Sequence, residues 1–191
     1  MEIHSFTEVN GPLMLTNKIW YDNRGWFSEV YRTSEIEKTL GVKFVQENIS
    51  HSFKNVIRGL HYQTSPKEQG KLIRCINGII HDVFVDIRKD SQTFGKWGGL
   101  IMYGGDVINN TVKEDTYRMI WIPPGFAHGF SVVSESATVA YSVTSEYSKE
   151  HEKTLKWNDD KINIMWACNG NPVVSGKDNE GLSIKDTNYA I

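Results

Sequence analysis

The stretch KLIRCINGIIHDVFVDI, residues 71–87, is the part of the chain that decides the fold class. Two apolar runs, Lys71–Ile76 and Ile79–Ile87, flank Asn77-Gly78, a dipeptide typical of a two-residue hairpin turn. Side chains alternate between the two faces of a strand. In the second run, one face therefore carries Val83, Val85 and Ile87, and the other carries Asp82, Phe84 and Asp86. We therefore predict two strands joined at Asn77-Gly78.

The same kind of pattern continues on both sides of this stretch. Residues 119–122 read as a strand that ends at Pro123-Pro124-Gly125, and residues 126–133 and 138–144 read as a strand pair around residues 134–136. One short helix is predicted, with Ser34 and Glu37 at capping-box spacing and Gly41 at its end. Many short strands with one helix predict an all-β sandwich or barrel.

Length and composition fit an ordinary globular protein with one domain, residues 1–191. The net charge of -2 and the lack of a basic stripe give no electrostatic support for nucleic-acid binding. The N-terminus lacks a signal-peptide pattern, and no apolar stretch is long enough to span a membrane. Cys75 and Cys168 do not form a disulfide framework, so we expect reduced thiols and a cytoplasmic protein. From Asn158 onward we expect loops with short helical turns, held to the barrel by Trp157 and Trp166.

Three clusters of residues could carry chemistry: RGLHYQ (58–63) with QGK (69–71), WIPPGFAHGF (121–130), and residues 141–147 with Glu152. A histidine or a strand tyrosine by itself is usually a packing residue, so none of these clusters is decisive alone. The histidines lack an H-x-H pair or tight ligand spacing, and there is no G-x-G-x-x-G motif. We therefore expect neither a metal nor another cofactor.

Seven stretches, in this order, resemble the dTDP-4-dehydrorhamnose 3,5-epimerase family over nearly the whole chain: DNRGWFSE (22–29), FVQEN (44–48), VIRGLHYQ (56–63), QGKLIR (69–74), residues 82–88, residues 122–130 and SGKD (175–178). One such stretch would be weak evidence, whereas seven in order are specific. The resemblance implies a cupin-type double-stranded β-helix, or jelly-roll barrel, with short peripheral helices. It also implies a cofactor-independent epimerase of a nucleotide-linked 4-keto-6-deoxy sugar, acting at C3 and C5.

The resemblance also assigns roles to individual residues. His61 would be the base and Asp178 its orienting partner, while Lys71 would stabilise negative charge on the sugar oxygen and Tyr141 would be the acid. The implied substrate-binding residues are Gln46, Asn48, Arg58, His128, Tyr147, Glu152 and Lys177. Arg24, Phe27 and Glu29 match positions that contact substrate across a dimer interface, so the resemblance predicts a homodimer.

The chemistry of these residue types agrees with such roles. Removing a proton next to a ketone produces an enolate, whose oxygen a nearby ammonium stabilises as the charge develops. A neutral imidazole is a suitable base near pH 7, and a carboxylate partner fixes its tautomer. A phenol can return the proton on the opposite face.

Two alternatives stay open at this point. The protein could epimerise only one carbon, or act on another nucleotide sugar; or it could be a barrel that binds a sugar nucleotide without catalysis. Residues 103–117 look like an insertion relative to the family, either a solvated loop or a lid that changes which sugar fits. Gly176 stands where the family often has Glu, which loosens the backbone beside Lys177 and Asp178.

Overall fold

The computed structural model describes residues 1–105, 107, 116–187 and 189. Its elements follow the chain in this order: β1 (Glu2–Ser5), β2 (Leu13–Lys18), β3 (Trp20–Asp22), β4 (Gly25–Phe27), α1 (Thr33–Leu40), β5 (Gln46–Phe53), β6 (Val56–Gln63), β7 (Lys71–Asp86), β8 (Trp97–Gly104), β9 (Thr116–Ile122), β10 (Phe126–Val132), β11 (Ser136–Val143), β12 (Glu152–Thr154), β13 (Val173–Val174), α2 (Gly176–Asn179) and the 3-10 turn η2 (Ile184–Asp186). The all-β prediction is confirmed.

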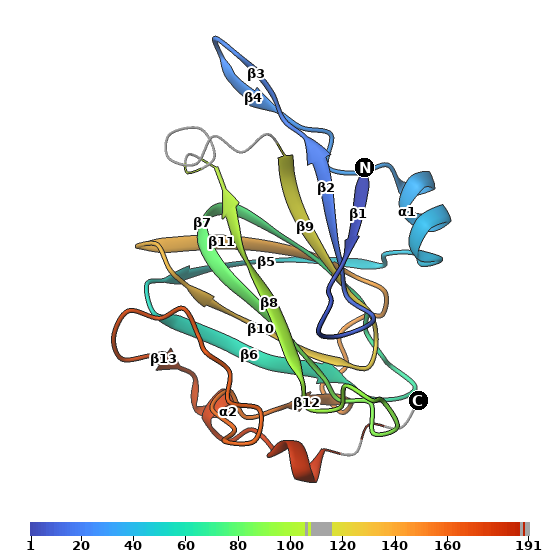
Figure 1. The fold of residues 1–191 in the computed structure, drawn as a ribbon, viewed down its shortest axis with the longest axis vertical. Coiled ribbons are helices and arrows are strands. Elements are labelled where there is room, and N and C mark those ends of the chain that lie inside the picture. Colours follow the sequence, from blue (N-terminus) through green and yellow to red (C-terminus); the bar gives the residue numbers. More distant parts are fainter. Residues whose placement is uncertain (106, 108–115, 188, 190–191) are drawn as a thin grey trace.

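Two β-walls face each other and share one long strand, β7 (Figure 1). The first wall has the order β1-β2-β9-β7-β11-β5, and all of its pairs are antiparallel. The second wall has the order β8-β7-β10-β6, with antiparallel β12 and parallel β13 continuing from β6. Together the walls form the jelly-roll barrel that was predicted.

The predicted hairpin at Asn77-Gly78 is wrong, because β7 runs on through this dipeptide as a bent strand. Its first half pairs with β9 and β11, and its second half pairs with β8 and β10. Gly78 has a φ of 87°, and a Cβ on it would lie 2.2 Å from the Ser136 carbonyl oxygen. The left-handed residue therefore makes a corner, where the strand leaves one wall and enters the other.

The bend also changes which residues point inward. Before it the inward residues carry odd numbers, such as Ile73 and Cys75, and after it they carry even numbers, such as Ile80 and Phe84. Val83, Val85 and Ile87 lie in a different cluster, on the outer side of the second wall. The predicted division of the two faces of residues 82–87 is therefore confirmed.

The predicted pairing of residues 126–133 with residues 138–144 is also wrong. Strands exist at both places, but β10 pairs with β6 and β7, whereas β11 pairs with β5 and β7. The chain between them crosses from the second wall to the first, where Ser134 Oγ accepts a hydrogen bond from the Ile79 backbone N–H. A short connection thus joins two walls and does not close a hairpin.

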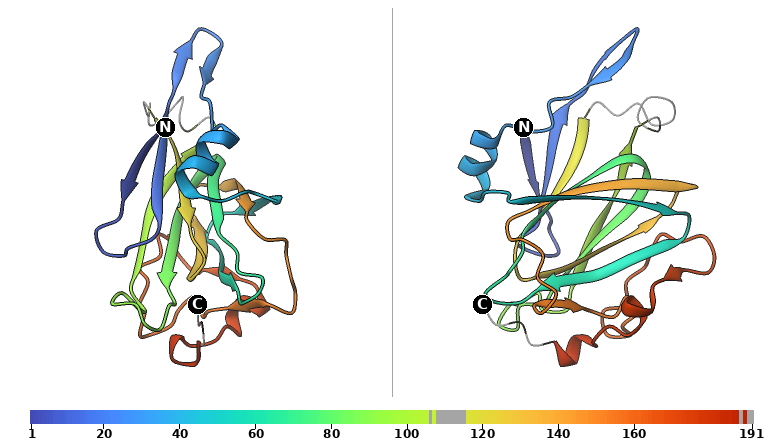
Figure 2. Two further views of the ribbon diagram at one scale, coloured as in Figure 1. Left: turned by 90° about the vertical axis from the view of Figure 1, so that its right-hand side faces the viewer. Right: turned by 180° about the vertical axis from the view of Figure 1, so that it is seen from behind.

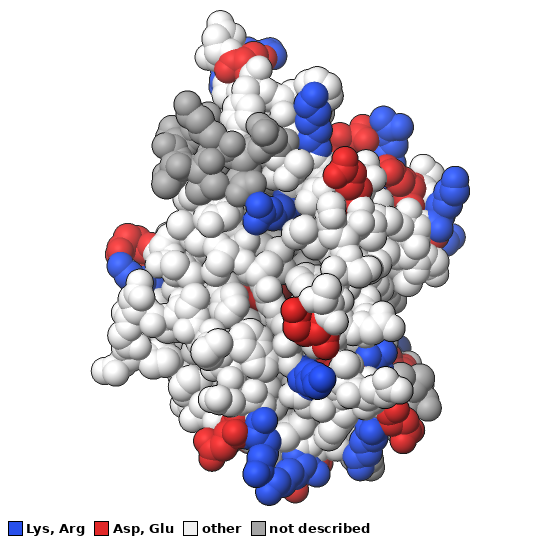
Figure 3. Space-filling model, viewed as in Figure 1, with Lys and Arg blue, Asp and Glu red and all other residues white. Residues whose placement is uncertain are grey.

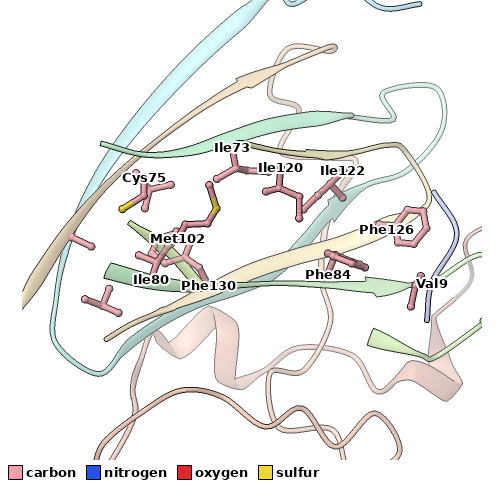
Figure 4. Close-up of a cluster of buried hydrophobic side chains, with 13 residues drawn as sticks. Val9, Ile73, Cys75, Ile80, Phe84, Met102, Ile120, Ile122, Phe126 and Phe130 are labelled. Atoms are coloured by element: carbon pink, nitrogen blue, oxygen red, sulfur yellow. The ribbon is translucent and has the colours of Figure 1, made fainter. Parts of the chain in front are cut away.

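Three apolar clusters hold the barrel together. The inner cluster fills the space between the walls and includes Phe84, Met102 and Ile120 (Figure 4). A second cluster lies under the C-terminal segment, and a third lies under α1, where Ile36 packs with Leu15 and other residues. Each wall is therefore covered on part of its outer face.

The peripheral segments follow the prediction in part. Helix α1 begins at Thr33, its N-cap Arg32 makes no side-chain cap bond, and Gly41 ends it with a φ of 69°. The capping box is thus wrong because the helix begins before Ser34, while the Gly41 end is confirmed. Beyond Asn158 the chain forms loops, the short helical turns α2 and η2, and the two-residue strand β13, which the prediction did not include. Trp166 Nε1 donates to the Trp157 carbonyl oxygen at 2.8 Å. Of the 103–117 insertion, residues 106 and 108–115 lie outside the described residues.

The two-stranded ribbon β3–β4 projects from one end of the barrel, away from the walls (Figure 2). On the face seen in Figure 3, charged side chains gather on this ribbon, near α1 and over the C-terminal segment, and the face between them is mostly uncharged. Among the described residues, no helix is long and apolar enough to cross a membrane.

Candidate active site

A cavity of about 250 Å³ opens between the two walls of the barrel. Its lining residues come from the strands β5, β6, β7, β10, β11 and β12, together with one residue just before β7 and one before β12: Gln46, Asn48, Ser50, Arg58, His61, Tyr62, Gln63, Gln69, Lys71, His128, Phe130, Tyr141, Tyr147 and Glu152. Polar and ionisable groups therefore converge in a pocket that is otherwise bounded by the apolar inner cluster. This is the pattern expected of a binding or catalytic site.

The strand register explains how the first wall contributes to this cavity. Tyr141 on β11 lies directly opposite Asn48 on β5 and Ile73 on β7. Residues opposite each other in antiparallel strands share a face, so Tyr141 and Asn48 point inward with Ile73. Two residues along, Gln46 and Lys71 follow on the same face.

A β-bulge lets the second wall contribute both Arg58 and His61. His61 pairs with His128 and Arg58 pairs with Phe130, and the register shifts between these pairs. Residues three apart on a regular strand point to opposite faces. Because β6 has one extra residue at the bulge, Arg58 and His61 both face the cavity.

Asp178 lies behind His61 and orients its ring. His61 Nε2 is 2.6 Å from Asp178 Oδ1, and the other carboxylate oxygen accepts from the Gly59 backbone N–H at 3.2 Å. Ser175 caps α2 by accepting from the Asp178 backbone N–H at 3.1 Å. When the ring donates through Nε2, its Nδ1 keeps the lone pair that can take a proton. Burial would raise the pKa of Asp178, but the hydrogen bond and charge of His61 and the bonds from Gly59 and Ser175 lower it overall.

Lys71 supplies a buried ammonium group inside the same cavity. Its Nζ donates to the His61 carbonyl oxygen at 3.0 Å, and the residue is only 7% exposed. Burial lowers the pKa of Lys71 to about 8, against the opposing influence of the charges on Glu152 and Asp82. The side chain is thus mostly a cation at pH 7, held in surroundings where its charge acts strongly.

Tyr141 lies on the first wall, on the same inward face as Lys71 and across the cavity from His61, and burial raises the pKa of its phenol. At neutral pH the phenol therefore carries its proton. His61 and Tyr141 belong to opposite walls, so that a ring bound between them would meet one residue on each face.

Glu152 joins two further predicted binding residues at the mouth of the cavity. Its Oε2 accepts from Tyr147 Oη at 2.9 Å and from Lys177 Nζ at 2.5 Å. Burial would raise the pKa of Glu152, but these two hydrogen bonds and the charges of Lys177 and His61 lower it overall. The carboxylate is therefore ionised, and it ties α2 to the start of β12.

Nine of the predicted site residues line the cavity, and Asp178 and Lys177 contact residues that do. Arg24, Phe27 and Glu29 do not belong to the lining within the described part of the chain. Arg24 pairs with Asp22 at 2.5 Å, Glu29 pairs with Arg32 at 2.9 Å, and Phe27 is 66% exposed on the projecting ribbon. The structure of one chain thus leaves these three residues outside its own site.

The prediction missed five lining residues, namely Ser50, Tyr62, Gln63, Gln69 and Phe130. Strand parity could have found Ser50, because it follows Gln46 and Asn48 on the same face of β5. The other four stand inside the clusters quoted from the sequence, where no feature separates a lining residue from its neighbours.

The chain is similar to known proteins in sequence and in structure over nearly its whole length. Residues 6–186 match the model of the family described as dTDP-4-dehydrorhamnose 3,5-epimerase. The protein of that name from Shigella flexneri is 43% identical over 187 residues, which cover 97% of each chain. Among solved structures, dTDP-6-deoxy-D-glucose-3,5-epimerase from Legionella pneumophila, in complex with dTDP-4-keto-L-rhamnose, has a TM-score of 0.86 and 38% identity, covering 98% of this chain and 94% of that one. A 3′-monoepimerase from Streptomyces bikiniensis in complex with dTDP-quinovose has a TM-score of 0.83 and 26% identity, covering 95% and 87%.

Proposed function

Because the chain belongs to the dTDP-4-dehydrorhamnose 3,5-epimerase family, we propose that it converts dTDP-4-dehydro-6-deoxyglucose to dTDP-4-dehydrorhamnose by inverting C3 and C5. The protein is an isomerase of the epimerase type. The observation that carries the assignment is the placement of His61, Lys71 and Tyr141 in one cavity, with Asp178 bonded to His61. These are the parts that deprotonation and reprotonation next to a ketone require.

The reaction would proceed through an enolate. His61, with Nε2 held by Asp178, removes the proton from a carbon next to the C4 carbonyl through Nδ1. The electrons of the broken C–H bond move to the carbonyl oxygen, where the ammonium of Lys71 stabilises the negative charge. Tyr141 then delivers its proton to the same carbon from the opposite face, which inverts that centre. His61 then releases its proton to water and Tyr141 takes one up from water, which restores both groups, and repetition at the second carbon gives the doubly inverted product.

The remaining lining residues suit a nucleotide-linked sugar. The guanidinium of Arg58 has the charge and geometry to bind a phosphate oxygen. Gln46, Asn48 and His128 offer hydrogen bonds to neutral groups, and Tyr147, Glu152 and Lys177 would close the mouth around the ligand. This chemistry needs no cofactor.

The projecting ribbon supports a homodimer in which each chain completes its partner's site. Arg24, Phe27 and Glu29 are exposed and lie outside their own cavity, as residues that serve a neighbour would. The edge strand β5 also exposes Ile49 (71%) and Phe53 (70%) on its outer face, apolar area that a second copy would cover. Light scattering should give a dimer, and a fully active monomer would contradict this assembly.

Hydrogen exchange into the sugar tests the reaction itself. The purified protein, without added cofactor or metal, is incubated with dTDP-4-keto-6-deoxyglucose in heavy water, and the sugar is followed by NMR. Deuterium at both C3 and C5 is expected, and folded His61→Asn should abolish it at both carbons.

The same spectra separate the alternatives. Label at a single carbon would indicate a monofunctional enzyme, the activity named for the Streptomyces bikiniensis relative. Nucleotide-sugar binding with no label at either carbon would indicate a barrel that only binds. Exchange at full rate in His61→Asn would overturn the role of His61.

A further inference from the structure

A buried carboxylate, Asp82 on β7, lies behind the cavity residue His128. His128 Nε2 is 2.9 Å from Asp82 Oδ2, Asp82 is fully buried, and His128 is 8% exposed. The strand register brings them together: Asp82 is opposite Phe130 and Phe84 is opposite His128, so the two residues are diagonal neighbours on the inward face. A histidine side chain is long enough to bridge this diagonal.

Asp82 differs from the other buried aspartate on the same face of the same strand. The carboxylate of Asp86 is also fully buried, and it is bonded by Arg88, Ser91 and Thr93. Asp82, within the described part of the chain, makes one side-chain hydrogen bond, to His128, and its Oδ1 is buried without a partner. Burying a carboxylate with a single hydrogen bond is costly, and although the charge of Lys71 also acts on Asp82, hydrogen bonding stabilises this carboxylate much less than that of Asp86.

The arrangement around His128 repeats the arrangement around the proposed base. His61 and His128 are cross-strand partners on β6 and β10, and each ring meets an aspartate through Nε2. The two aspartates come from different elements, since Asp178 belongs to α2 and Asp82 to β7. A carboxylate acceptor fixes the proton on the nitrogen it faces, and the opposite ring nitrogen is then the one that meets a ligand.

We propose that Asp82 is a positioning residue for substrate binding, which acts by holding the proton of His128 on Nε2 and directing Nδ1 to the nucleotide sugar. This inference rests on the proposed function. It assigns to Asp82 no contact with the substrate and no proton transfer. Asp82 would only orient one binding group, so its replacement should raise KM and leave kcat almost unchanged.

Steady-state kinetics of Asp82→Asn, His128→Asn and the double variant test this role. Losing a charge-assisted hydrogen bond behind a binding group should raise KM by about ten- to a hundred-fold. We expect kcat to stay within about threefold of the wild-type value, and the double variant to be no worse than His128→Asn, because Asp82 acts through His128. Asp86→Asn is the matched control, which should unfold more easily with unchanged KM.

Three outcomes would overturn the proposal: an unchanged KM in folded Asp82→Asn, a loss confined to kcat, or penalties that add in the double variant. Should Asp82→Asn fail to fold, NMR of the wild-type protein with ¹⁵N-labelled histidine gives an independent answer. A proton on Nε2 of His128 supports the proposal, and a proton on Nδ1 with Nε2 bare refutes it. Wild-type protein that neither binds nor turns over the nucleotide sugar would instead refute the proposed function, so the two failures are distinct.

Discussion

Replacing Lys71 by methionine should make the protein more stable and almost inactive. Methionine has a similar length and no charge, so it fits the buried site without leaving an ammonium there. Burial lowers the pKa of Lys71 from 10.5 to about 8, which means that folding favours the neutral amine. Below both pKa values the charged side chain therefore destabilises the folded protein.

The size of this effect follows from the two pKa values. At about 1.36 kcal/mol for each pKa unit, the fall from 10.5 to about 8 corresponds to about 3 kcal/mol of lost stability at pH 7. Methionine would also remove the hydrogen bond from Lys71 to the His61 carbonyl oxygen, which would lower the free energy of unfolding by about 1 kcal/mol. The net gain is about 2 kcal/mol, or roughly 4–8 °C in Tm for a chain of this length.

The pH dependence of this gain has a definite sign. Between pH 8 and 10.5 the unfolded chain binds more protons at Lys71 than the folded chain does, so wild-type stability from this group rises with pH. The advantage of Lys71→Met should therefore be complete below pH 8 and should vanish toward pH 10.5. The variant should also lose about 10²–10³ in kcat, the usual effect of removing a group that stabilises an oxyanion.

Urea unfolding at pH 7 and pH 10, together with kcat at pH 7, measures both effects. Lys153, an exposed lysine on β12, provides the matched control, since Lys153→Met should change neither stability nor rate. A Lys71→Met protein that is less stable than wild type at pH 7, or one that keeps its activity, would refute the reasoning about the buried ammonium.

Three further predictions concern the same site. The wild-type kcat should fall above about pH 8, because Lys71 loses its proton there. In Lys71→Arg the side chain stays charged, so kcat should not fall in this range. A pH–rate profile to pH 10 for both proteins tests this expectation. Asp178→Asn should lower kcat by about ten- to a hundred-fold, because the amide cannot stabilise charge on His61; an unchanged rate of deuterium exchange would contradict this. Gly59→Ala should lower the free energy of unfolding by about 1–3 kcal/mol, because φ at this position is +113° and a Cβ would lie 2.6 Å from the His128 carbonyl oxygen. Urea unfolding measures this change, and a fully stable variant would show that the two strands can move apart.

The local pattern of the sequence predicted which residues share a face, but it failed where the outcome depends on distant partners. Alternation in residues 82–87 is a property of any strand, and it was sufficient to separate the two faces. Whether Asn77-Gly78 reverses the chain or only bends it depends on which strands are available for pairing. Those strands, β9 and β11, come more than thirty residues later, so the hairpin signal gave the wrong answer.

The candidate site shows the same limit. His61 and Asp178 are 117 positions apart, and only the family resemblance linked them before the structure placed them 2.6 Å apart. The family resemblance did not link His128 to Asp82, although both residues stand in stretches that match the family. Parity puts each of them on the inward face, but a diagonal contact between them requires the register of β7 against β10.

The bend at Gly78 has a consequence for how this chain can vary in length. Lys71 and Asp82 lie on opposite sides of that corner, each on the inward set of its own half of β7. Inserting or deleting one residue there would turn every side chain of the second half over, bringing Val83 and Val85 inward and sending Asp82 and Phe84 outward. Surface loops can lengthen without such a reversal. The corner must keep its number of residues, because only then do the inward residues of both halves of β7 point into the barrel.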